Sequence, residues 1–97
     1  MRLVNVWPMR CRGKYRPVMD TRVFTLRLMM RTGEARRRRE AVGASYPEAG
    51  ESASPPVHPS TIHRWETGER LPHGAAAVAY LDVLEAFARL IEREGAA

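Results

Sequence analysis

The last quarter of the chain carries the pattern that most restricts its fold. Residues 74–94 read GAAAVAYLDVLEAFARLIERE, and apolar residues recur there at alternating steps of four and three: Ala77, Leu81, Leu84, Ala88 and Ile91. That period belongs to an amphipathic α-helix, and Glu85 and Arg89 on the polar face form a favourable i, i+4 pair. The sequence therefore predicts one long C-terminal helix against which the rest of the domain packs.

The apolar surface of that helix is wider than a small domain can cover. Five further apolar residues broaden it: Val78, Tyr80, Val83, Phe87 and Leu90. The chain has 97 residues, enough for one small domain with a modest core. The surplus predicts either a second contact with the core or a homodimer formed through residues 74–94.

Three earlier segments also read as helices. Residues 20–32 open with two N-cap residues and place apolar residues on one helical face, although their alternation would also suit a strand. Residues 34–42 consist of strong helix formers, residues 59–67 begin with a proline, and each of these two segments stops at a glycine. We prefer a helix for 20–32 because the following segment is helical. A mainly α fold of four to five helices is expected.

The charge of the chain is divided unevenly. Residues 1–39 hold twelve basic and two acidic side chains, whereas residues 40–97 hold four basic and nine acidic ones. Fifteen of the sixteen cations are arginine, whose planar fork suits phosphate and guanine, although a GC-rich genome would produce the same bias. A basic half joined to an acidic half predicts a polyanion-binding surface attached to a packing module.

The first 18 residues predict a basic arm that precedes a domain at residues 19–97. Two prolines and a glycine prevent a long element there, so we expect a short strand or a disordered segment. The single cysteine, Cys11, excludes an intrachain disulfide and fits a reducing compartment. No apolar run approaches the ~18 residues of a membrane span. We therefore expect a cytoplasmic, nucleoid-associated protein with no membrane partner.

Four consecutive arginines lie on the helix predicted at 34–42: Arg36, Arg37, Arg38 and Arg39. Such a run is either a solvated helical surface or a surface that meets phosphates. We favour the second interpretation and expect all four to contact the phosphates of a nucleic acid.

The short helix at 59–67 combines two anchors with several polar side chains. Ile62 and Trp65 stand three apart, so they share one face and predict a contact with the core. The remaining positions of its first turns carry hydroxyl, imidazole and guanidinium groups: Ser60, Thr61, His63 and Arg64. Either this is a surface helix with two anchors, or it displays those groups to a ligand. The major groove of B-DNA admits one such helix.

A resemblance favours the second reading. Residues 57–72, VHPSTIHRWETGERLP, resemble the recognition helix and following turn of the Cro/repressor-type, or XRE-type, helix-turn-helix family. The residues that match the pattern are Val57, Ser60, Thr61, Ile62, Trp65, Glu66, Gly68 and Pro72. The segment GAAAVAYLDVLEAFARL is similar to the later helix of that family. The resemblance implies a small helix-turn-helix bundle that binds double-stranded DNA.

The resemblance also implies a role for each residue. The residues that would contact bases in the groove are Pro59, Ser60, His63 and Arg64, with Arg64 the best candidate for guanine. His58, Thr61 and Arg70 would contact phosphates. Val57, Ile62 and Trp65 would be core residues, and Glu66 would pair with an arginine of the first helix.

The helix that precedes the recognition helix departs from the family pattern. Residues 54–56 read Ser-Pro-Pro where the family has a Leu-Gly-type turn. In one register, 39–45 ends the first helix and 47–53 is a degraded second helix. In the other, 34–43 is the second helix and 44–58 is an inserted loop. We favour the second register because it keeps residues 20–32 as the first helix.

Other site classes have little support. Cys11, His58, His63 and His73 lack the spacing of a zinc site, and Ser60, His63 and Glu66 lie on one short helix that cannot assemble a catalytic triad. We expect no metal, no cofactor and no enzymatic activity. The sequence predicts a dimeric, sequence-specific DNA-binding regulator of prokaryotic or phage type. The alternative is a protein-binding module, such as an antitoxin, an anti-defence factor or a polymerase-binding accessory.

Overall fold

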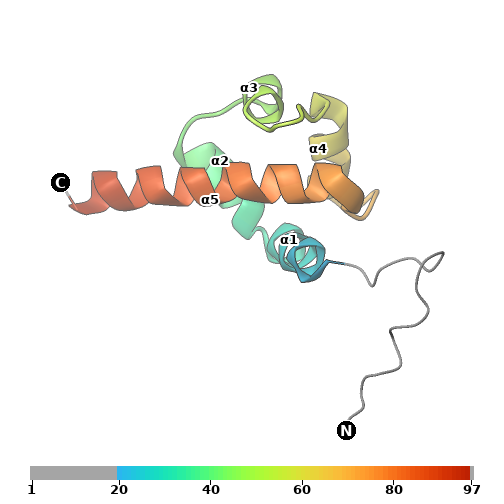
Figure 1. The fold of residues 1–97 in the computed structure, drawn as a ribbon. Coiled ribbons are helices and arrows are strands. Elements are labelled where there is room, and N and C mark those ends of the chain that lie inside the picture. Colours follow the sequence, from blue (N-terminus) through green and yellow to red (C-terminus); the bar gives the residue numbers. More distant parts are fainter. Residues whose placement is uncertain (1–19, 97) are drawn as a thin grey trace, which may run out of the picture.

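The computed structural model describes residues 20–96, which form five helices and no strand. The helices are α1 (Thr21–Thr32), α2 (Glu34–Ala41), α3 (Tyr46–Glu51), α4 (Pro59–Thr67) and α5 (Gly74–Ala96). α5 crosses the bundle and packs against α1 and α2, while α3 packs against α4 (Figure 1). The expected mainly α-helical bundle of four to five helices is confirmed. The basic arm expected at residues 1–18 lies outside the described residues.

α1 is a helix, and the strand alternative for this segment is wrong. The carboxylate of Asp20 accepts a hydrogen bond from the backbone N–H of Arg22 at 2.9 Å, which caps the first turn. The helix ends at Gly33, whose φ of 85° is easily reached only by glycine. Four apolar residues of α1 are buried: Val23, Leu26, Met29 and Met30. Two others, Phe24 and Leu28, remain exposed on the outer side of the helix.

The register that treats 44–58 as an inserted loop is wrong, because this segment contains α3. Ser45 and Glu48 form a capping box: the Ser45 hydroxyl accepts from the Glu48 N–H at 3.2 Å, and the Glu48 carboxylate accepts from the Ser45 N–H at 2.9 Å. Gly50 lies against the chain that enters α4, and its carbonyl accepts from the Val57 N–H at 3.0 Å. A Cβ at position 50 would stand 2.0 Å from the Val57 carbonyl oxygen. Glycine therefore allows α3 and the start of α4 to pack closely.

The core lies where α1, α4 and α5 meet. Its largest fully buried side chains include Leu26 of α1, Ile62 of α4, and Tyr80, Leu81 and Leu84 of α5. The C-terminal turns of α5 extend past this core (Figure 1), and Leu90 is 45% exposed there. No helix of the described part of the chain has the length and apolar character to cross a membrane.

Candidate nucleic-acid interface

α4 is a nine-residue helix with a defined start and end. Pro59 occupies the first helical position, and Nδ1 of His58 accepts from the Ser60 N–H at 3.1 Å as the N-cap. At the other end, Gly68 has φ 84°, and the N–H groups of Glu69 and Arg70 both donate to the Arg64 carbonyl. These bonds end the helix at the turn formed by residues 68–73.

One side of α4 is buried and the other is open. Ile62 is fully buried and Trp65 is 3% exposed, with the Trp65 and Tyr80 rings 6.0 Å apart between centroids. Val57, just before the helix, is buried as well. His63 and Arg64 are exposed on the other side. The core thus fixes which side of α4 is available to a ligand.

A buried ion pair adds a third anchor to α4. Arg39 of α2 donates to both carboxylate oxygens of Glu66, from Nε at 2.8 Å and from the terminal nitrogen at 3.0 Å. The Glu66 side chain is 3% exposed, and its hydrogen bonds to Arg39 raise the pKa of that arginine. The Tyr46 hydroxyl donates to Oε1 of Glu66 at 2.9 Å, and the Arg39 guanidinium lies 4.1 Å from the Tyr46 ring centroid. Glu66 therefore joins α4 to both α2 and α3.

Tyr46 also reaches the open side of α4. Its ring meets the His63 imidazole edge to face, with centroids 5.5 Å apart and planes at 89°. Burial and the hydrogen bond to Glu66 raise the pKa of Tyr46, so its hydroxyl stays protonated as a donor. The exposed His63 thus rests on a residue that is itself bound to the buried ion pair. The sequence offered no signal for this contact beyond an aromatic residue in a polar segment.

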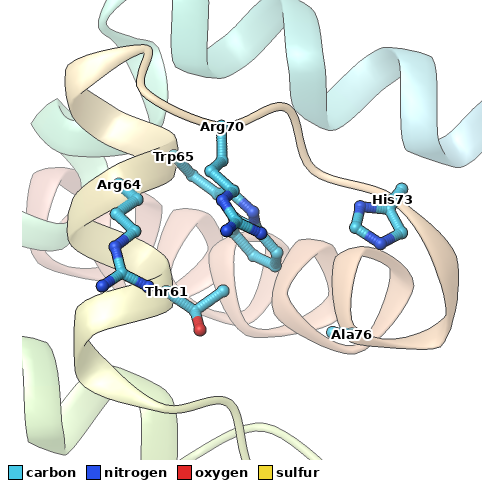
Figure 2. A pocket seen from close by; sticks show the side chains of 6 residues that line it. All are labelled: Thr61, Arg64, Trp65, Arg70, His73 and Ala76. Carbon is cyan, nitrogen blue, oxygen red and sulfur yellow. The ribbon is translucent and has the colours of Figure 1, made fainter.

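The turn after α4 encloses a small pocket of about 200 Å³ (Figure 2). Its lining comes from α4, the turn and the first turn of α5: Thr61, Arg64, Trp65, Arg70, His73 and Ala76. Neither Arg64 nor Arg70 forms an ion pair within residues 20–96. Two free cations, a hydroxyl and an imidazole beside one cavity make a surface suited to a phosphate group. We did not predict from the sequence that His73 lies at this surface.

The hydroxyl of Ser60 has a partner of its own. Its Oγ lies 2.8 Å from Nδ1 of His58, the same nitrogen that caps the helix. Because Nδ1 acts as an acceptor, the proton of a neutral His58 ring sits on Nε2. Ser60 then offers lone pairs rather than a proton to a groove, and His58 offers an N–H.

Two members of the arginine run that we expect to contact phosphates have partners within the fold. Arg39 is 7% exposed and is held by Glu66 and the Ala44 carbonyl. Arg38 is partly buried, pairs with Glu34 and donates to the Leu84 carbonyl of α5 at 3.3 Å. Packing of α2 against α5 and α4 turns these side chains inward. Arg36 and Arg37 remain exposed and pair with acids of their own helix.

Within residues 20–96, no three His, Cys, Asp or Glu side chains gather as metal ligands. The chain itself matches a family model described as a helix-turn-helix domain over residues 33–93. The protein belongs to this helix-turn-helix family. No curated protein and no solved structure matches it.

The match covers four of the five described helices, α2 to α5. It begins at Gly33, so α2 is the first helix it covers, and α1 precedes it. α3 and α4 are consecutive helices within the matched range, and they pack against each other. In helix-turn-helix domains that bind DNA, the second helix of the pair enters the major groove.

Proposed function

We propose that this protein is a sequence-specific transcriptional regulator of the XRE type, from a prokaryote or a phage. One observation carries the proposal: α4 is fixed by Ile62, Trp65 and Glu66, while His63 and Arg64 project from its open side. In this role the protein binds DNA in the cytoplasm and catalyses no reaction.

Base recognition would depend on the first two turns of α4 in the major groove. Arg64 has no acidic partner within residues 20–96, so its guanidinium is free for the O6 and N7 atoms of guanine. His63, held by Tyr46, is the second base-reading side chain. Ser60 would accept a hydrogen bond, and Pro59 would offer apolar surface to a thymine methyl group.

Phosphate contacts would flank the groove on both sides of α4. Arg70 and Thr61 line the pocket beside the turn, and His58 presents Nε2 at the start of the helix. Arg36 and Arg37 are exposed on α2 and form a secondary electrostatic surface, with their acidic partners Glu40 and Glu34 reducing its strength.

A homodimer through α5 fits a palindromic operator. Leu90 is exposed between two shallow grooves of about 290 and 420 Å³, both lined in part by α5. In a two-fold dimer the same surface meets itself, so one Leu90 can enter a groove of the partner. Such a dimer would place two copies of α4 in successive turns of the major groove, about 34 Å apart.

The experiment begins with selection of an operator from randomised DNA. The affinities of the wild type, Arg64→Ala and Arg70→Ala are then measured on selected and on random duplexes at several salt concentrations. We expect Arg64→Ala to reduce the preference for the operator by about 1–3 kcal/mol. Arg70→Ala should weaken binding to both duplexes alike and reduce the salt slope by about 1. An equal loss on both duplexes for Arg64→Ala would contradict the base contact.

A further inference from the structure

Three of the four large apolar side chains exposed in the described residues lie together. Phe24 and Leu28 project from α1 and are 52% and 53% exposed, and Leu71 from the turn after α4 is 62% exposed. With Arg27 and Arg31 they line a groove of about 450 Å³. We call these five residues the α1–Leu71 surface. Exposed apolar residues that gather rather than scatter mark an interaction site.

The fold holds this surface in place. Nε of Arg27 donates to the Pro72 carbonyl at 2.7 Å, which fastens the turn at 68–73 to α1. The Arg27 guanidinium also lies 5.6 Å from the centroid of the Phe24 ring. Phe24 and Leu28 stand one helical turn apart and so form one apolar row along α1. Arg27 and Arg31 have the same spacing and form a parallel cationic row.

The α1–Leu71 surface carries only positive charge. No acidic side chain lines the groove, and neither Arg27 nor Arg31 forms an ion pair within residues 20–96. The arginines of α2 differ, because each is paired with a glutamate. The groove therefore fits an occupant that has an apolar row beside a row of carboxylates.

We propose that the α1–Leu71 surface binds an acidic amphipathic helix of a partner protein. α1 has 12 residues and is about 18 Å long, so a partner helix of roughly three turns can lie along it. Its apolar side chains enter the groove between α1 and Leu71, and its carboxylates meet Arg27 and Arg31. This contact lies outside the proposed DNA-reading side of α4 and does not depend on it.

Charge disfavours two other occupants of the groove. Residues 1–18 contain five basic residues and no acidic one, so they would bring like charge to Arg27 and Arg31. The exposed end of α5 in a second copy offers Leu90, but Arg89 and Arg93 there balance Glu92 and Glu94. A DNA backbone carries the required charge but no apolar row to fill the groove.

The test uses two labelled 18-residue probe peptides and the full chain. Both are amphipathic helices with leucines on one face; one carries glutamates beside the leucines and the other carries lysines at the same positions. Fluorescence anisotropy measures their binding. We expect the acidic peptide to bind the wild type at least about tenfold more tightly than the basic one. Leu28→Ser and Leu71→Ser should each weaken it by about tenfold or more, and Arg31→Glu should reverse the preference.

Matched variants and DNA measurements complete the design. Arg93→Ser changes an exposed side chain of α5 outside the groove and should leave peptide binding unchanged. Circular dichroism checks that each exposed-site variant folds. Failure of the acidic peptide to bind, or equal binding to wild type and Leu28→Ser, overturns the proposal. An increase of about tenfold in peptide binding on deletion of residues 1–18 would show that these residues occupy the groove, and would overturn the proposal. Loss of self-association in sedimentation for Leu28→Ser would overturn it in favour of a second copy. Weaker DNA binding, instead of weaker peptide binding, by Leu28→Ser and Leu71→Ser would overturn it in favour of DNA.

Discussion

Arg39 and Glu66 form a buried ion pair that joins α2 to α4, with Nε 2.8 Å from Oε2. The two residues are 27 positions apart in the chain, and each also bonds a further group, the Ala44 carbonyl for Arg39 and the Tyr46 hydroxyl for Glu66. Because both charged groups are almost fully buried, each needs the opposite charge of the other to offset the free energy lost with its hydration. The pair sets the orientation of α4 relative to the two preceding helices.

Glu66→Ala should therefore destabilise the protein strongly. It leaves the Arg39 guanidinium buried without its partner, which costs about 3–5 kcal/mol of the free energy of unfolding. Urea denaturation followed by circular dichroism measures the loss. Glu40→Ala is the matched control, since it removes the acid of the exposed Arg36–Glu40 pair and should have little effect. Equal losses in the two variants would show that the buried Arg39–Glu66 pair contributes no more to stability than the exposed Arg36–Glu40 pair.

Tyr46 should influence which base α4 prefers, although it is placed on α3. Tyr46→Leu removes the ring edge against His63, so discrimination at the base pair read by His63 should fall while binding to random DNA is retained. Tyr46→Phe keeps the ring and removes the hydrogen bond to Glu66. It should lower the free energy of unfolding by about 1.5–3 kcal/mol with base preference maintained. Operator selection with both variants, beside urea denaturation, separates the two effects. Unchanged base preference in Tyr46→Leu would rule out the positioning role.

Gly50→Ala should disrupt the junction of α3 and α4. The added methyl group would stand 2.0 Å from the Val57 carbonyl oxygen, and backbone atoms cannot yield as a flexible side chain does. We expect a loss of about 3 kcal/mol or more in the free energy of unfolding. Gly95→Ala is the control, because a Cβ at that helical position meets nothing within 4 Å and alanine is the better helix former. A Gly50→Ala protein as stable as wild type would mean that the two segments are farther apart than described.

Acid should weaken the fold through carboxylates that accept hydrogen bonds in it. The side chain and backbone N–H of Arg22 lower the pKa of Asp20 to about 2, and hydrogen bonds also lower the pKa of Glu34 and of Glu48. Since these values lie below those of the unfolded chain, their stabilisation is present above about pH 4 and is lost as the pH falls toward 2.

Asp20→Asn isolates one part of this effect. Asparagine retains N-cap ability but does not titrate, so the free energy of unfolding should fall less steeply between about pH 5 and pH 2 than in wild type. Urea denaturation across that range provides the slopes. Identical slopes for the two proteins would show that Asp20 titrates alike in the folded and unfolded states.

The longer helices could be predicted because their signals are local. The apolar period of residues 74–94 predicts α5, and the spacing of Ile62 and Trp65 predicts the buried side of α4. A helix near α3, at 47–53, was only the less favoured alternative, because this segment is short, includes Pro47 and Gly50, and has almost no apolar period. The capping-box pattern Ser45–Glu48 was present and would have indicated the start of this helix.

The site was only partly predictable, because its contacts join distant residues. A run of four arginines gives no sign that Arg39 will meet an acid 27 positions later or that Arg38 will turn toward α5. Likewise, the contact of Tyr46 with His63 arises only once α3 packs on α4. Local patterns identified α4 as the candidate reading helix, whereas tertiary packing decided which cations remained available to a nucleic acid.

In the proposed complex, Arg64 reads a guanine edge in the major groove. The most direct test measures the affinities of wild type and Arg64→Ala for the selected operator, with guanine or 7-deazaguanine at each position in turn. Loss of N7 removes one acceptor of the arginine fork. We expect one position at which 7-deazaguanine weakens binding by the wild type by about 1 kcal/mol or more and leaves binding by Arg64→Ala unaffected. Equal losses in the two proteins at every guanine would contradict it.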